Sequence, residues 1–148
     1  MFSEKAVILI KKASLEFDKI ANPILQEHNL TGAQYKIVKY LLMHKDENVR
    51  QIDIEKYYSL THPTAIGLLD KLEEKGFVKR EVNPNDGRSR IITLTDMAIS
   101  KQAELIEVGD LLESELTCGL SKTERNQLIG LLDKLLAGIE DKSGGKKK

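Results

Sequence analysis

Cysteine, tryptophan and net charge are what this 148-residue sequence has least of. The single cysteine, Cys118, excludes an internal disulfide framework and a paired-cysteine metal site, and it fits a reducing, cytoplasmic setting. Tryptophan is absent and aromatics make up 5%, so the abundant Leu, Ile, Lys and Glu favour one soluble, mostly helical domain. Basic and acidic residues number 23 each, and overall charge therefore gives no support to a nucleic-acid partner.

Long hydrophobic runs and catalytic motifs are also missing. The apolar run Ala6–Ile10 is too short for the core of a signal peptide or for crossing a bilayer, so no membrane partner is expected. His28, His44 and His62 are scattered, without the i, i+4 spacing or cysteine partner of a metal site. No glycine-rich phosphate loop is present. We therefore expect no enzyme, no metal and no other cofactor, and a lone Cys118 is more often structural than a redox switch.

Apolar residues three and four positions apart predict a series of amphipathic helices. In the first helix, from Ile10 to Ile24, Pro23 is expected to bend the last turn unless the helix ends before it. A second helix begins at the capping-box pair Thr31 and Gln34. Inward positions are expected in this helix and in the two that follow: Tyr35, Val38, Leu41, Leu42, Ile54, Tyr57 or Tyr58, Ala65, Leu68, Leu69 and Leu72.

Two further helices are expected near the end of the chain. Thr95 caps a long one that Gly119 ends, and the capping box Ser121 with Glu124 opens the last one. Their apolar stripes are Ile99, Ala103, Ile106 or Leu105, Leu112 and Leu116, and then Leu128, Leu131, Leu132, Leu135 and Ile139.

The middle of the chain predicts a capped helix followed directly by a hairpin. Thr61 caps this helix, and Gly76 ends it because glycine tolerates the left-handed conformation there. Strands are expected at Phe77–Val82 and Arg90–Leu94, with the pair Asp86-Gly87 in the turn and the glycine at positive φ. The predicted fold class is therefore mainly α with a small β-hairpin wing, a winged helix-turn-helix.

A helix beside an arginine-tipped hairpin suits DNA, because the helix fits one groove and the basic hairpin the next. In the first helical turn, Thr64 can bond a base or a phosphate, and His62 can donate to a guanine acceptor or a phosphate. Arg88 suits a narrow minor groove, and Asp86 is expected to preorganise it by an ion pair. The candidate DNA-contacting residues are Thr61, His62, Pro63, Thr64, Ile66, Lys71, Asp86, Arg88 and Arg90.

Simpler explanations stay open for these residues. The helix is then an ordinary surface helix with a good cap, and the hairpin a solvated turn with incidental charge. Between residues 50 and 90 there are eight basic and seven acidic residues, a net of 8 − 7 = +1. Binding would thus use ordered phosphate contacts, for which Lys71, Lys75, Lys79 and Arg80 are the candidates. The low charge leaves room for an alternative, a winged-helix protein-interaction module that does not bind DNA.

The two ends of the chain carry more apolar residues than one helix face needs. Adjacent examples are Ile8, Leu9 and Ile10, Leu111 and Leu112, and Leu135 and Leu136. We expect residues 1–30 and 96–141 to form the dimerisation helices of a symmetric homodimer, and residues 31–95 to form the DNA-binding lobe. The alternative is a monomer whose end helices cover the central module. Residues 142–148, rich in Gly and Lys, predict a flexible tail, either natural or added.

Nearly the whole chain resembles the multiple antibiotic resistance regulator (MarR) family of bacterial winged helix-turn-helix transcription factors. The resemblance implies a homodimer on a pseudo-palindromic operator in double-stranded DNA, usually as a repressor, with Arg88 in the minor groove and Asp86 supporting it. It is carried by Leu30-Thr31 with Gln34-Tyr35, by the segment Leu72–Arg80, by Asp86–Arg90, by Leu94-Thr95, and by Leu120-Ser121 with Glu124.

The resemblance also implies an effector. Many members lose DNA affinity when a small aromatic ligand, often a phenol or carboxylate, binds them; Tyr35 would border that site, or serve as a buried core tyrosine. Three features depart from the family pattern. Ile66 and Gly67 stand where relatives often carry polar residues, so Ile66 is expected to touch a thymine methyl instead. The segment Asp96-Met97-Ala98 lacks the usual glycine, and Cys118 does not match the family's oxidation-sensing cysteine.

Overall fold

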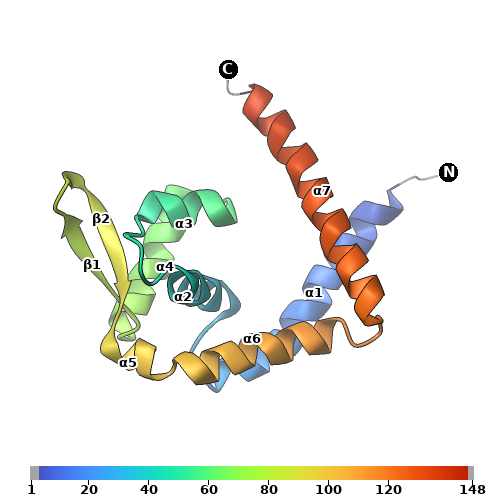
Figure 1. Cartoon of the computed structure of the whole chain (residues 1–148), viewed down its shortest axis with the longest axis horizontal. Helices are drawn as coiled ribbons and strands as arrows, with labels where there is room; N and C mark the ends of the chain where they lie inside the picture. The colour runs from blue at the N-terminus through green and yellow to red at the C-terminus, as the bar shows by residue number, and fades with distance from the viewer. Residues whose placement is uncertain (1–3, 147–148) are drawn as a thin grey trace. The chain divides into compact units, whose positions relative to one another are not determined.

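The computed structural model describes residues 4–146, with side chains through residue 142. The described part of the chain forms seven helices and a two-stranded antiparallel sheet (Figure 1). By its contacts the chain divides into two units, residues 1–112 and 113–148. The elements are α1 (Lys5–Gln26), α2 (Gly32–Met43), α3 (Gln51–Tyr58), α4 (His62–Glu74), β1 (Val78–Asn83), β2 (Asp86–Leu94), α5 (Asp96–Ser100), α6 (Gln102–Leu116) and α7 (Lys122–Lys146).

Helices α1 and α2 begin the first unit. Pro23 lies inside α1, and the helix continues to Gln26 instead of ending before the proline. The predicted capping box of α2 is confirmed: Thr31 Oγ1 accepts the Gln34 N–H at 3.2 Å, and Gln34 Oε1 accepts the Thr31 N–H at 3.1 Å. Because these two bonds satisfy backbone donors that a helix start leaves free, they fix where α2 begins.

Helices α3 and α4 form the helix-turn-helix, and they contact each other. The predicted cap of α4 is confirmed, since Thr61 Oγ1 accepts the Thr64 N–H at 3.3 Å. The predicted end is confirmed too: Gly76 has a φ of +83°, a conformation that suits glycine because it lacks a Cβ. The lobe buries Ile54, Ala65, Leu69 and Leu72 and half-buries Leu68 and Tyr58, whereas Tyr57 is exposed.

Strands β1 and β2 pair antiparallel, with Val78 opposite Leu94 and Val82 opposite Arg90. The two residues between the strands are Pro84 and Asn85, so the prediction that the pair Asp86-Gly87 forms the turn is wrong. The pairing shifts register between Val82 and Asn83, and this bulge moves the turn toward the proline. In the described part of the chain Gly76 is the glycine with positive φ, and Gly87 is not.

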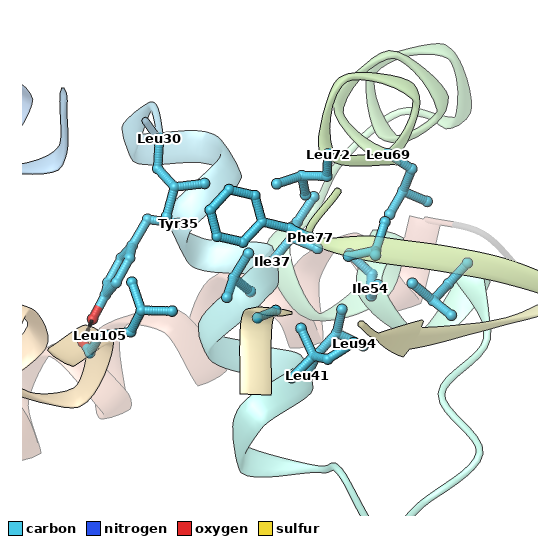
Figure 2. Packing of buried hydrophobic residues seen from close by; sticks show 14 of the residues in the cluster. Leu30, Tyr35, Ile37, Leu41, Ile54, Leu69, Leu72, Phe77, Leu94 and Leu105 are labelled. Carbon is cyan, nitrogen blue, oxygen red and sulfur yellow. Dashed lines mark hydrogen bonds between the residues drawn. The ribbon is translucent and has the colours of Figure 1, made fainter. Parts of the chain in front are cut away.

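The core of the lobe lies where α2, α4 and the base of the hairpin meet (Figure 2). Phe77, which is 2% exposed, follows the end of α4 and packs in the cluster with Leu30, Ile37 and Leu72. The predicted inner residues Tyr35, Val38 and Leu41 of α2 are buried, and so is Ile37, which the predicted stripe leaves out. The core therefore packs against both α4 and the base of the hairpin.

The long helix predicted after Thr95 is interrupted. Thr95 Oγ1 accepts the Ala98 N–H at 3.2 Å as predicted, but α5 ends at Ser100 and Lys101 separates it from α6. Of the predicted stripe, Leu112 is buried, and so is Leu105, which was predicted as the alternative to Ile106. Val108, which the stripe leaves out, is buried too, whereas the predicted residues Ile99, Ala103, Ile106 and Leu116 are exposed.

Helix α7 makes up most of the second unit. Its predicted capping box is confirmed, with the Ser121 N–H donating to Glu124 Oε1 at 2.9 Å and the Glu124 N–H donating to Ser121 Oγ at 3.1 Å. The helix continues to Lys146, past the predicted start of the tail at residue 142; residues 147–148 of that tail lie outside the described residues. No helix in residues 4–146 is long and apolar enough to span a membrane.

Candidate nucleic-acid interface

The first turn of α4 presents polar side chains to solvent. His62, Pro63 and Thr64 are all exposed, while Ile66 is half-buried. The Thr61 hydroxyl accepts the Thr64 N–H and donates to Thr64 Oγ1 at 2.9 Å. Because the Thr61 hydroxyl donates to Thr64 Oγ1, the Thr64 hydroxyl can donate its own proton to an acceptor on a ligand. Thr61 therefore shapes this turn, and Thr64 is the residue that can contact a ligand.

The tip of the wing is braced by short-range hydrogen bonds. Asp86 Oδ1 accepts the backbone N–H of Arg88 at 3.0 Å, and Asn83 Nδ2 donates to Ser89 Oγ at 3.0 Å. Asp86 thus supports Arg88 through its backbone, and no ion pair between these two side chains occurs among the described residues, contrary to the prediction. The Arg88 side chain, near the start of β2, is exposed.

A groove with a volume of about 390 Å³ lies between α3, α4 and the wing. Four arginines and one glutamate line it. Arg50 is paired with Asp53, and Arg80 with Asp70 and Glu73, whereas Arg88 and Arg90 have no carboxylate partner among the described residues. Concentrated positive charge in a groove raises the local potential for a polyanion. The predicted residues His62, Ile66, Arg88 and Arg90 line it together with Arg50, Gln51, Ile52, Glu55, Arg80 and Ser89.

Two of the expected phosphate anchors have partners inside the protein. Arg80 Nη2 lies 2.6 Å from Asp70 Oδ1 and 2.8 Å from Glu73 Oε1, which ties β1 to α4. The hydrogen bond from Arg80 lowers the pKa of the Glu73 carboxyl. Lys75 Nζ donates to Gln34 Oε1 at 2.7 Å and also to the backbone carbonyl of Asn29, in the loop between α1 and α2, so both cations link parts of the protein.

Lys71 and Lys79 differ from those two cations. The Lys71 ammonium lies 3.5 Å from Glu74, with 65% of its side chain exposed, and Lys79 lies 3.9 Å from Glu81. Long, exposed ion pairs of this kind contribute little and exchange easily. Of the four candidate phosphate anchors, these two lysines are the ones held only by long, exposed ion pairs.

Arg50 and the polar residues of α3 were not predicted as part of the site. Asp53 accepts the Arg50 backbone N–H at 2.9 Å and its guanidinium at 3.0 Å, and this hydrogen bonding raises the pKa of Arg50. Glu55 accepts from Gln51 at 3.0 Å and lies 2.9 Å from the ring of His62. The three-residue spacing of Arg50 and Asp53 at the start of a helix is a sequence signal that could have predicted their hydrogen bonds. The contact of Glu55 with His62 depends on how α3 and α4 cross.

Tyr35, the predicted ligand-bordering residue, is 7% exposed. Its hydroxyl donates to the Leu105 carbonyl at 2.7 Å, and burial raises its pKa, with a further contribution from the charge of Asp110. A Cβ at Gly109 would lie 2.7 Å from the Tyr35 hydroxyl, so a glycine there permits the approach of α6 to α2. Tyr35 is thus a core residue that joins two helices, and its role beside a ligand stays a prediction.

These elements define a winged helix-turn-helix protein with an arginine-lined groove. The sequence profile of the MarR family matches residues 28–89. S. aureus MepR in its DNA-binding conformation is 30% identical, covers 90% of this chain and 98% of its own, and superposes with a TM-score of 0.79. The transcription regulator MarR from Oenococcus oeni PSU-1 is 30% identical, with coverages of 89% and 98% and a TM-score of 0.75.

A third similar structure is a mutant MarR from E. coli complexed with operator DNA. It is 28% identical, covers 92% of this chain and 99% of its own, and has a TM-score of 0.79. The chain described here belongs to the MarR family. In residues 4–142, no group of His, Cys, Asp and Glu side chains is arranged to hold a metal ion.

Proposed function

We propose that this protein is a sequence-specific DNA-binding transcriptional regulator, and that it acts as a repressor. The observation that carries the proposal is the groove between the exposed first turn of α4 and the wing, where Arg88 and Arg90 have no carboxylate partner among the described residues. The likeness to a MarR bound to operator DNA and to MepR in a DNA-binding conformation supports it. In a neutral chain, such a local concentration of arginines favours an anionic partner at this face.

Each part of the site has a distinct task in this proposal. Helix α4 enters the major groove, where Thr64 donates to a base or a phosphate and Ile66 contacts a thymine methyl. Arg88 enters the adjacent minor groove, since a planar guanidinium suits a narrow groove of strong negative potential. Lys71 contacts a phosphate and fixes the position of the helix without reading sequence. Asp86 keeps the wing tip in shape through its bond to the backbone.

The regulator acts as a homodimer on a pseudo-palindromic operator. The apolar side chains of α1 and α7 support this assembly, because many of them are more than half exposed in the single chain. A twofold interface would remove them from water, and two α4 helices would then face two half-sites of DNA. The residues concerned are Val7, Ile8, Leu9, Leu15, Leu131, Leu136 and Ile139.

A small aromatic effector, phenolic or carboxylate in character, relieves repression in this proposal. Tyr35 offers the nearest test, because its hydroxyl would have to exchange the Leu105 carbonyl for the ligand. Calorimetric titration of the parent protein and of Tyr35→Phe with salicylate, a phenolic carboxylate, measures whether such a ligand binds and whether the hydroxyl is needed. A Tyr35→Phe variant with unchanged response would separate effector binding from this residue.

A mobility-shift assay with the DNA upstream of the protein's own gene tests the proposed function. We expect a discrete complex that resists competition by unrelated DNA of equal length and weakens as salt rises. Absence of binding to either DNA, even at low salt, would favour the protein-interaction module instead.

Lys71→Ala sharpens the same assay. It should weaken all DNA sequences alike and flatten the salt dependence by about 0.9 in log–log slope, the value for one lost phosphate contact. A loss confined to the operator sequence would contradict a phosphate role for Lys71.

A further inference from the structure

His62, in the first turn of α4, is held at one edge of its ring. Its Nδ1 lies 2.9 Å from Oε2 of Glu55, on α3. The Glu55 side chain is 11% exposed, whereas that of His62 is 67% exposed. One ring edge is therefore fixed by a nearly buried carboxylate, and the rest of the ring faces outward on the surface proposed for DNA.

The chemistry of this contact determines which nitrogen of His62 carries the proton. An ionised carboxylate only accepts, so Nδ1 must be the donor. Gln51 Nε2 also donates to Glu55 Oε2, at 3.0 Å. The hydrogen bonds from Gln51 and His62 lower the pKa of Glu55, which keeps it ionised near neutral pH. Gln51 Nε2 lies 3.1 Å from Nδ1 of His62, and the shared carboxylate oxygen satisfies both donors.

The outward nitrogen then has a defined character. In the neutral ring, a proton on Nδ1 leaves a lone pair on Nε2, so this atom accepts a hydrogen bond. In the major groove, the bases that offer a donor are adenine, through its N6 amino group, and cytosine, through its N4 amino group. Guanine O6 and N7 and thymine O4 are acceptors and would face this lone pair unfavourably.

We propose that Glu55, supported by Gln51, acts as a positioning residue that makes His62 an acceptor, so that His62 selects adenine or cytosine in the operator. The inference rests on the proposed DNA-binding function and adds which class of base this position reads. It reverses the sequence-based expectation that His62 donates to guanine. Glu55 itself does not touch DNA and acts through the histidine ring.

The tautomer of His62 is tested first, on the full chain without DNA. Two-dimensional NMR of ¹⁵N-histidine-labelled protein at pH 8.5, well above the reference value of about 6.5 for imidazole, distinguishes the two neutral forms. The sequence has three histidines, and His62→Gln assigns the signal in question. We expect Nδ1–H at His62 in the parent and a population shift toward Nε2–H in Glu55→Ala. Predominant Nε2–H in the parent would overturn the proposal.

Base selection is tested with a panel of operator duplexes that carries each base pair in turn at every half-site position. We expect the parent to prefer adenine or cytosine at one position by at least about fivefold, the smaller end of a specific base contact. His62→Ala and Glu55→Ala should both flatten that preference and leave the other positions unchanged. Lys56→Ala, on the exposed face of the same helix, is the matched control and should keep it.

Three outcomes would overturn the selection of base. In the first, the parent prefers guanine or thymine at the position where His62→Ala loses discrimination. In the second, Glu55→Ala keeps the parental base preference. In the third, His62→Ala changes the base preference at no position. Binding to no duplex by any variant would overturn the proposed function and the base selection with it. The NMR result decides the tautomer independently, so the two failures are distinguishable.

Discussion

The lobe from α2 to β2 and the terminal helix α7 use the same apolar residue types in opposite ways. In the lobe, Leu69 and Leu72 are 0% exposed and Phe77 is 2% exposed. In α7, Leu131 is 66% exposed and Leu136 is 52% exposed. The lobe therefore completes a core within one chain, whereas the apolar side chains of α7 remain in water unless a second surface covers them. The free energy of unfolding of the lobe should therefore not depend on protein concentration, whereas the stability that α7 gains by association should depend on it.

The largest expected effect is loss of the lobe core. Phe77→Ala should cost about 3–5 kcal/mol of unfolding free energy, because it removes a ring that is 2% exposed and leaves a cavity. Urea unfolding followed by circular dichroism measures it, and the loss should be the same at low and high protein concentration. Val82→Ala, at a strand position that is 54% exposed, is the control and should cost far less. Equal costs for the two variants would contradict the assignment of the core.

Helix α7 gives the next largest effect and the sharpest contrast. Leu131→Ala should lose about 1.5–3 kcal/mol per side chain in the assembled state, the value of burying a leucine. The loss should appear as a higher dimer dissociation constant in analytical ultracentrifugation and as a concentration-dependent melting temperature. Lys134→Ala, on the same helix, should leave association unchanged. A parent protein that stays monomeric at every concentration would remove the contrast between the two regions.

A smaller effect is expected at the cap of α4. Thr61→Ala should cost about 1 kcal/mol of unfolding free energy, because the Thr64 N–H loses its acceptor. It should also weaken DNA binding, since the cap shapes the first turn of the helix, whereas Thr61→Ser should retain both properties. Ser121→Ala is the matched change at the capping box of α7, and its cost should depend on protein concentration. If the costs of Thr61→Ala and Ser121→Ala depended equally on protein concentration, the proposed difference between the lobe and α7 would be contradicted.

A further effect concerns alkaline pH, and it belongs to the lobe, which contains all four tyrosines. Burial raises the pKa of Tyr58 to about 12, and its hydroxyl donates to the Lys36 carbonyl at 2.8 Å. The folded lobe thus retains a proton that the unfolded chain releases near pH 10. The stability from this group is present below about pH 10 and is lost as pH rises toward 12. Tyr58→Phe should reduce that slope in denaturant midpoints.

The sequence predicted those features whose causes lie within a few residues. The caps at Thr31, Thr61, Thr95 and Ser121 were predicted because each joins atoms three positions apart, and Gly76 because its conformation suits only certain residues. Composition and spacing also indicated an exposed helix start and an arginine-tipped hairpin. These local signals were enough to predict the fold class.

The features that were missed depend on distant contacts. The partners of Arg80 lie seven and ten positions away in the sequence, and Gln34 lies 41 positions from Lys75. The sequence therefore could not show that these two cations have partners inside the protein. The break at Lys101 sets Leu105 inward instead of Ile106, and helical periodicity alone could not choose between them. Glu55 meets His62 only because α3 and α4 pack together.

The central claim, that the wing and α4 bind adjacent grooves of one operator, is tested most directly by replacing Arg88. Fluorescence anisotropy with labelled operator, at several salt concentrations, compares the parent with Arg88→Ala and Arg88→Lys. The account predicts a loss of about 1–3 kcal/mol for the alanine variant and a partial loss for lysine, which keeps the charge without the planar fork. Parental affinity of Arg88→Ala at every salt concentration would contradict the claim.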